Sequence, residues 1–136
     1  MIDRKSPQMK SVKWILRLLA SVILLQSLIF KFGALPDSVA LFTRLGLEPY
    51  GRIGLGIIEL VVAIMILIPR TTIYGAMLGM IIMFGAILTH FFVLGIVFQK
   101  DEGSLFYLAV SCFLACTMLC IILKGRIFSK KRKYAN

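Results

Sequence analysis

The sequence predicts an all-α integral membrane protein, a four-helix bundle with a short amphipathic helix in its first outer loop. Of its 136 residues, 60% are hydrophobic, and the mean hydropathy is +0.94. Soluble domains are only about 45–50% apolar. The apolar residues also form four long runs, each sufficient to cross a bilayer. We therefore expect one domain whose solvent is the lipid bilayer.

The first predicted span covers about residues 14–32, and the short amphipathic helix lies in the loop that follows, residues 33–51. Pro36 is typical of the start of a helix, and apolar residues such as Phe42 follow it at helical spacing. Pro49 is expected to end this segment, because the residue before a proline disfavours helix.

Three further spans are predicted, at about residues 52–68, 73–98 and 105–123. Pro69 marks a tight turn before the third span, and Thr72 is expected to cap its helix. A polar turn from Gln99 to Ser104, carrying Asp101, separates the third span from the fourth. Gly125 is expected to end the fourth helix.

The basic residues predict the orientation of the chain. The net charge is +10, and basic segments at residues 1–13 and 124–136 flank the first and last spans. The 16 Lys and Arg residues divide twelve to four in favour of the side that holds the termini and the Pro69 turn. The positive-inside rule therefore predicts cytoplasmic termini. This distribution argues against nucleic-acid binding, and it suits contact between the last segment and anionic lipids.

Strongly polar side chains are costly inside a membrane, so each one needs an explanation. One such residue lies in each predicted span, and these four are Gln26, Glu59, His90 and Cys112. Each lies seven or eight residues from the outer end of its helix, which corresponds to a depth of about 10–12 Å. The shared depth predicts one polar layer in the outer half of the bundle.

The faces of the predicted helices place this layer inside the bundle. Gly75 and Gly79 lie on the same helix face as His90, and small residues mark the faces where membrane helices approach closely. A similar small-residue face surrounds Glu59. We therefore expect both side chains to point inward, where His90 or Gln26 could form a hydrogen bond with Glu59.

Each of these residues has a structural interpretation beside the functional one. A protonated Glu59 or a Gln26 amide could serve only to link helices by hydrogen bonds. Lys31, at the outer end of the first span, is expected to extend its ammonium group to the interface. The cysteines at positions 112, 116 and 120 recur every four residues and are expected to be small core residues.

Several enzyme classes are excluded by missing motifs. The sequence has one histidine, so haem ligation by two histidines within the chain is excluded. Glu59 and His90 alone would leave a metal under-coordinated, so no metal site is predicted. The sequence contains no CxxC, HExxH, P-loop, GxGxxG or serine nucleophile-elbow motif.

Five segments together resemble one protein family. They are Lys31-Phe32-Gly33, Ala40-Leu41-Phe42-Thr43-Arg44-Leu45-Gly46, Glu48-Pro49, Gly56-Ile57-Ile58-Glu59-Leu60 and Gly85-Ala86-Ile87-Leu88-Thr89-His90-Phe91. In this order and spacing they resemble the DoxX family of small bacterial membrane proteins, over about residues 31–123.

The resemblance implies a four-helix bundle in the bacterial cytoplasmic membrane, associated with redox chemistry. The family takes its name from a subunit of a thiosulfate:quinone oxidoreductase, and other members resemble membrane partners of oxidative-stress enzymes. On this interpretation Glu59 and His90 are the candidate catalytic residues. Gln26, Lys31 and Cys112 are the candidate ligand-binding residues, and the implied ligand is a quinone.

Three functions stay open at this point. The first is a component of a quinone-linked oxidoreductase system, whose electrons would come from a partner protein or a substrate. The second is a scaffold or assembly factor without enzymatic activity, as more distant relatives suggest. The third is a transporter of protons or small solutes, which would favour a homo-oligomer because four helices leave little room for an aqueous path.

Overall fold

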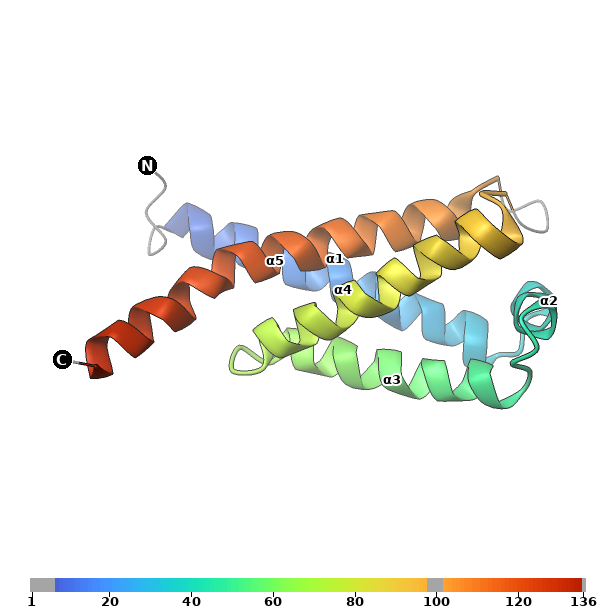
Figure 1. Ribbon diagram of the computed structural model, residues 1–136, viewed down its shortest axis with the longest axis horizontal. Helices are drawn as coiled ribbons and strands as arrows, with labels where there is room; N and C mark the ends of the chain where they lie inside the picture. Colours follow the sequence, from blue (N-terminus) through green and yellow to red (C-terminus); the bar gives the residue numbers. More distant parts are fainter. Residues whose placement is uncertain (1–6, 98–101, 136) are drawn as a thin grey trace.

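The computed structural model describes residues 7–97 and 102–135, and the described residues confirm the predicted all-α class (Figure 1). Four of their helices are long and apolar enough to cross a membrane. The elements are α1 (Pro7–Phe32), α2 (Pro36–Arg44), α3 (Tyr50–Leu67), α4 (Thr72–Thr89), the π-helical turn η1 (His90–Leu94) and α5 (Ser104–Tyr134). The chain is therefore a multi-pass membrane protein.

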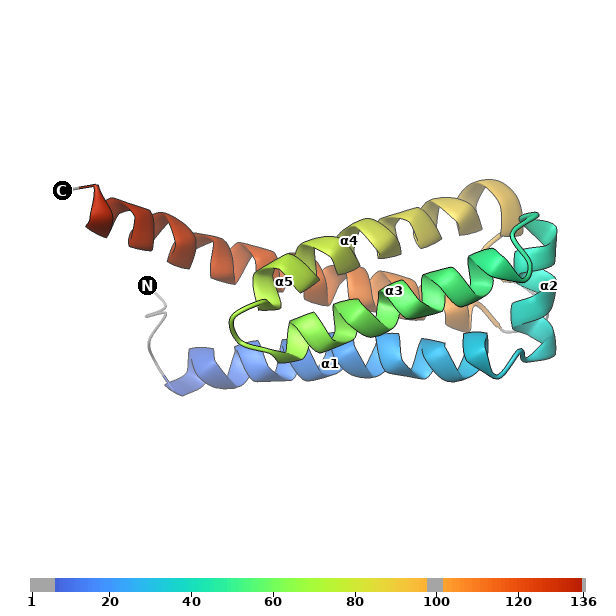
Figure 2. The same cartoon turned by 90° about the horizontal axis from the view of Figure 1, so that it is seen from below.

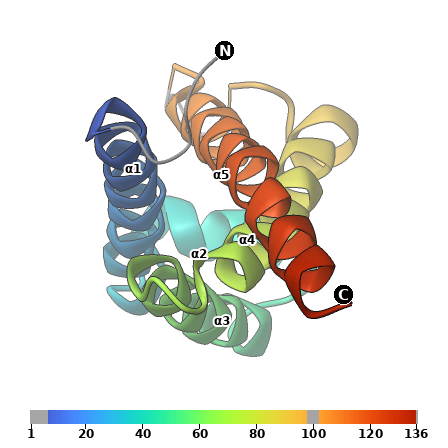
Figure 3. The same ribbon diagram turned by 90° about the vertical axis from the view of Figure 1, so that its left-hand side faces the viewer.

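The four long helices form a bundle in which each helix packs against two others. α1 contacts α3 and α5, and α4 also contacts α3 and α5. Figure 2 shows the long helices running side by side, with α2 turned across one end. The view along the bundle in Figure 3 shows α2 lying behind the long helices. The predicted amphipathic helix is confirmed as α2, and its Phe42 is buried.

Glycines on α4 allow its close contact with the neighbouring helices. A Cβ atom at Gly75 would lie 2.8 Å from the backbone nitrogen of Ile66 on α3. A Cβ atom at Gly79 would lie 2.9 Å from Sγ of Cys116 on α5. Both distances are too short for a real side chain. The small-residue face predicted for the third span is therefore a contact face, as expected for membrane helices.

Several helix ends differ from the predicted ones. The first helix begins at Pro7, before the predicted span, and α2 ends at Arg44 rather than at Pro49. The third span leaves helical geometry after Leu94 rather than continuing to Phe98, because Gly95 adopts a φ of +79° that glycine tolerates. Residues 98–101, which include the predicted turn residues Gln99 and Asp101, lie outside the described residues. Gly125 does not end the last helix, since α5 continues to Tyr134. One glycine costs a helix only about 1 kcal/mol.

The turn between α3 and α4 is held by side chains that bind the last carbonyl groups of α3. The predicted capping role of Thr72 is wrong: its hydroxyl donates backward to the carbonyls of Ile66 and Ile68, at 3.0 and 2.8 Å. Arg17 of α1 donates from Nε to the Ile66 carbonyl at 2.9 Å and also binds the Leu67 carbonyl. These contacts satisfy helix-end acceptors that would otherwise be unpaired in lipid.

Candidate functional site

A buried ion pair joins α1 and α3 near the end of the bundle that α2 covers. Nζ of Lys31 lies 2.9 Å from Oε2 and 3.1 Å from Oε1 of Glu59. The two side chains are only 9% and 2% exposed. The predicted inward position of Glu59 is confirmed. The predicted interfacial position of Lys31 is wrong, because its ammonium group turns inward to the carboxylate instead of outward to water.

A serine completes this cluster. The hydroxyl of Ser27 donates to Oε2 of Glu59 at 2.9 Å and accepts a hydrogen bond from Nζ of Lys31. Ser27 lies one helical turn before Lys31, so both side chains emerge from the same face of α1. We call Ser27, Lys31 and Glu59 the ion-pair cluster. Charges buried in this way need partners, and here each charged group has one.

A second ion pair fixes the backbone beside the cluster. Arg52 is buried, and its guanidinium group binds the carboxylate of Glu48, with Nη2 at 2.8 Å from Oε1. The same guanidinium group donates to the main-chain carbonyl of Lys31. Arg52 thereby ties the start of α3 to the end of α1, and it positions the residue that carries the buried ammonium group.

His90 lies at the junction of α4 and η1 and is 5% exposed, which confirms its predicted inward position. Its Nδ1 lies 2.9 Å from the main-chain carbonyl of Ala86, one turn earlier. Its ring packs against Phe106 of α5, with ring centroids 5.9 Å apart. Nε2 is buried and has no hydrogen-bond partner among the described residues. The predicted hydrogen bond from His90 or Gln26 to Glu59 is wrong, since Ser27 and Lys31 occupy that role.

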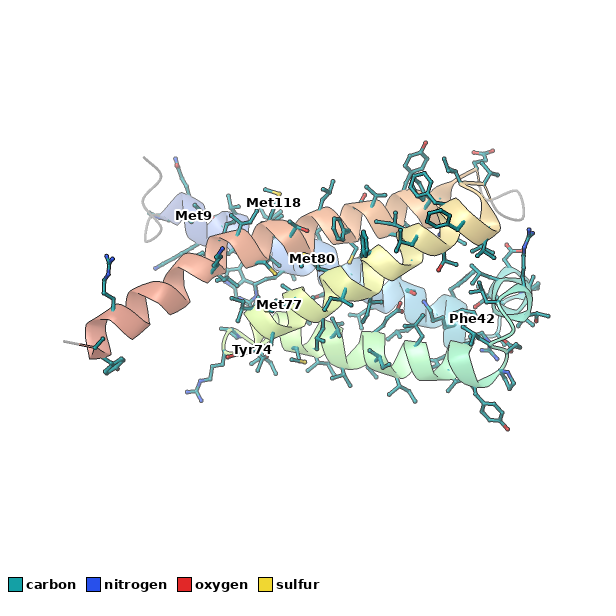
Figure 4. All side chains as sticks on the ribbon, viewed as in Figure 1. Met9, Phe42, Tyr74, Met77, Met80 and Met118 are labelled. Carbon is teal, nitrogen blue, oxygen red and sulfur yellow. The ribbon has the colours of Figure 1, made fainter. Side chains whose placement is uncertain are left out.

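A cavity of about 450 Å³ connects these polar groups. Most of its lining is apolar, and Phe42 of α2 forms part of its wall at the end where Figure 4 labels this residue. The polar side chains in its wall are Gln26, Ser27, Lys31, Glu59, Thr89 and His90. Ligand-binding cavities in proteins range from about 300 to 1,000 Å³ and share this combination of apolar walls with a few polar groups.

Two predicted site residues occupy different positions from those expected. Gln26 lines the cavity, but its side chain is exposed, so the prediction of a buried glutamine is wrong. Cys112 is fully buried in the packed core, where its thiol lies 3.9 Å from the carbonyl of Ala20. Cys112 is not part of the described cavity wall. The predicted role of Cys112 in ligand binding therefore has no support from its position.

Two parts of the site were missed by sequence reasoning, although each left a signal. Ser27 precedes Lys31 by four residues, a spacing that places two helical side chains together. Glu48 precedes Arg52 by the same interval. A spacing of four residues is common by chance, so neither pair could be recognised before Lys31 and Glu59 were known to meet.

Residues 15–118 match the DoxX-like family. The chain belongs to the DoxX-like family. The matched region contains the ion-pair cluster, His90 and the described wall of the cavity. No curated protein and no solved structure shows significant similarity to this DoxX-like protein.

Proposed function

We propose that this DoxX-like protein is a membrane component of an oxidoreductase system linked to the quinone pool, and that its cavity holds the quinone ring. The observation that carries the proposal is an apolar cavity whose wall includes a buried ion pair and His90, a histidine with one unpartnered ring nitrogen. A quinone has the matching character, because its flat apolar ring carries two oxygen atoms.

In this proposal Glu59 and His90 exchange hydrogen bonds or protons with the ring oxygens, while Lys31 stabilises the carboxylate. Both groups line the same cavity from different helices, so one ligand can contact both. Hydrogen bonds and charge interactions are stronger in a buried, largely apolar site than they would be in water. Gln26, at the exposed edge of the cavity, can hydrogen-bond the ligand as it enters.

The electrons that reduce the bound quinone would come from a partner protein or from a substrate. The protein itself would lie in the bacterial cytoplasmic membrane, with both of its termini in the cytoplasm. The twelve-to-four division of basic residues supports this orientation. The family resemblance supports the redox association. A homo-oligomer is compatible with the proposal but is not required by it, since the described cavity wall comes from a single chain.

Two glycines allow a sharp test of the cavity. A Cβ atom at Gly85, in the cavity wall, or at Gly54, away from it, would meet no atom within 4 Å. Gly85→Leu should therefore fill part of the cavity without displacing the backbone, and Gly54→Leu is its matched control. The probe is a benzoquinone with a decyl chain, and its binding is measured in lipid nanodiscs. It should bind the parent and Gly54→Leu with similar affinity, and it should bind Gly85→Leu at least about tenfold more weakly.

Absence of saturable binding of this probe to the parent protein, in both its quinone and its hydroquinone form, would overturn the proposal. Equal binding to Gly85→Leu would show that the probe occupies another surface. The redox link is tested in cells, by deleting the gene and measuring the ratio of quinol to quinone in the membrane. Gly54→Leu should restore the parental ratio and Gly85→Leu should not. Restoration by both variants would favour a scaffold over a quinone-binding component.

A further inference from the structure

The hydrogen-bond roles of the cavity residues distinguish the oxidised from the reduced form of a ligand. His90 provides the clearest case. Its Nδ1 faces the carbonyl of Ala86, and a carbonyl oxygen can only accept. Nδ1 therefore carries the proton of the neutral ring, and Nε2 is left as an acceptor. That acceptor is buried and has no donor among the described residues, and it belongs to a side chain of the cavity wall.

The ion-pair cluster likewise offers a ligand a hydrogen-bond acceptor rather than a donor. Nζ of Lys31 contacts three acceptors, Oγ of Ser27 and the two oxygens of Glu59, which matches the three N–H bonds of an ammonium group. The Ser27 hydroxyl proton is already directed to Glu59. Among the described residues, Oε1 of Glu59 accepts one hydrogen bond and Oε2 accepts two, so Oε1 keeps a free lone pair.

The other polar groups in the wall do not reverse this pattern. The Thr89 hydroxyl donates to the carbonyl of Gly85 at 2.8 Å, so its proton is also engaged. Gln26 can donate or accept equally well, and it lies at the exposed edge. Ser38 also has a buried oxygen without a partner, but it does not line the described cavity. The buried wall is thus rich in acceptors and short of donors.

We propose that the cavity selects the reduced form of its ligand, a neutral aromatic ring with two hydroxyl groups, and that Nε2 of His90 accepts a hydrogen bond from one of them. This inference rests on the proposed quinone-linked function and adds which redox form is bound. A quinone offers only carbonyl acceptors, which would leave Nε2 unpaired. A hydroquinone of nearly the same shape supplies the missing O–H donors.

The ion-pair cluster also restricts the charge of the ligand. Lys31 and Glu59 neutralise each other, so a charged ligand would enter an apolar cavity without a free counter-charge. Such a ligand would lose its hydration with little compensation. A hydroquinone is neutral and keeps its apolar ring against the wall.

The first test compares three decyl-chain probes in nanodiscs under anaerobic conditions: the benzohydroquinone, the benzoquinone and the dimethyl ether of the hydroquinone. The ether keeps the ring and oxygens but has no donor. We expect the hydroquinone to bind about tenfold more tightly than either competitor, because an unpaired buried acceptor is costly. The variant His90→Phe keeps an aromatic ring but lacks Nε2. In this variant the logarithm of the ratio between the dissociation constants of the ether and the hydroquinone should fall by at least about half.

The outcomes separate this inference from the proposed function. Tighter or equal binding of the quinone or of the ether overturns the selection of the reduced form, while the cavity remains a quinone site. Absence of binding by all three probes overturns both proposals. An unchanged preference in His90→Phe overturns the role of Nε2.

A second measurement does not depend on a variant that must fold. His90 is the only histidine in the chain, so ¹⁵N-histidine labelling gives the signals of one ring. In the ligand-free protein we expect a protonated Nδ1 and an unprotonated Nε2. Addition of the hydroquinone, but not of the ether, should shift the Nε2 resonance to lower frequency, as for a nitrogen that accepts a hydrogen bond. A protonated Nε2 in the ligand-free protein would overturn the inference.

Discussion

At the scale of single residues, the pairing of Lys31 with Glu59 changes the effect on stability that is expected when Glu59 is replaced. A buried glutamate that served alone as a hydrogen-bonding link could be replaced by glutamine with little loss. Here the same replacement leaves the Lys31 ammonium group buried without its counter-charge. Removal of one partner of a buried ion pair costs about 3–5 kcal/mol, whereas removal of both is often nearly neutral.

We therefore predict strong coupling between these two positions. Lys31→Met and Glu59→Gln should each lower the free energy of unfolding by about 3 kcal/mol, because each leaves one uncompensated charge. The double variant should lose far less than the sum of the single losses. Unfolding in mixed micelles provides the measurement. Additive losses would contradict the buried pair. If the double variant is stable, as expected, it can also be used to test quinone binding without a folding defect.

The sequence was informative about which residues face inward and less so about which residues meet. The depth of Glu59 and His90 and the small residues on their faces predicted their burial correctly. The same approach misplaced Lys31, because a lysine near a helix end usually reaches water. Its actual partner lies 28 positions away on another helix. Such a contact depends on how α1 and α3 pack, which helical periodicity alone does not specify.

At the scale of elements, the packing of α4 depends on glycines that have no room for a side chain. Figure 1 shows α4 between α3 and α5, and Gly75 is the position where α4 meets the backbone of α3. The helix ends were less predictable than the helices, since Gly95 ends a span through its positive φ while Gly125 continues a helix.

We predict that Gly75→Ala destabilises the bundle although alanine favours helix. The added Cβ atom would lie 2.8 Å from the backbone nitrogen of Ile66, and backbone cannot move aside cheaply. Overpacking of this kind costs about 1–3 kcal/mol. Gly54→Ala is the matched control, because its Cβ meets open space. That variant should be stabilised by up to about 1 kcal/mol through helix propensity. Equal unfolding free energies for the two variants would contradict the close contact.

At the scale of the whole molecule, the two ends of the bundle differ in character. At one end α2 covers the cavity, and the ion-pair cluster lies beneath it. At the other end Arg17 binds the last turn of α3, and α5 extends past its neighbours in Figure 1. If the basic end faces the cytoplasm, as the distribution of lysine and arginine predicts, the ligand cavity lies in the outer half of the membrane.

The predicted orientation of the chain, with both termini in the cytoplasm, can be tested with single introduced cysteines. Asp37 on α2 and Ala135 after α5 are both exposed, which makes them suitable positions. Ser38 is unsuitable because it is fully buried. In intact cells an impermeant thiol reagent should label Asp37→Cys and should label Ala135→Cys only after lysis. The parent is the control, since its cysteines lie within a membrane span. The reverse labelling pattern would invert the topology and place the cavity in the inner half of the membrane.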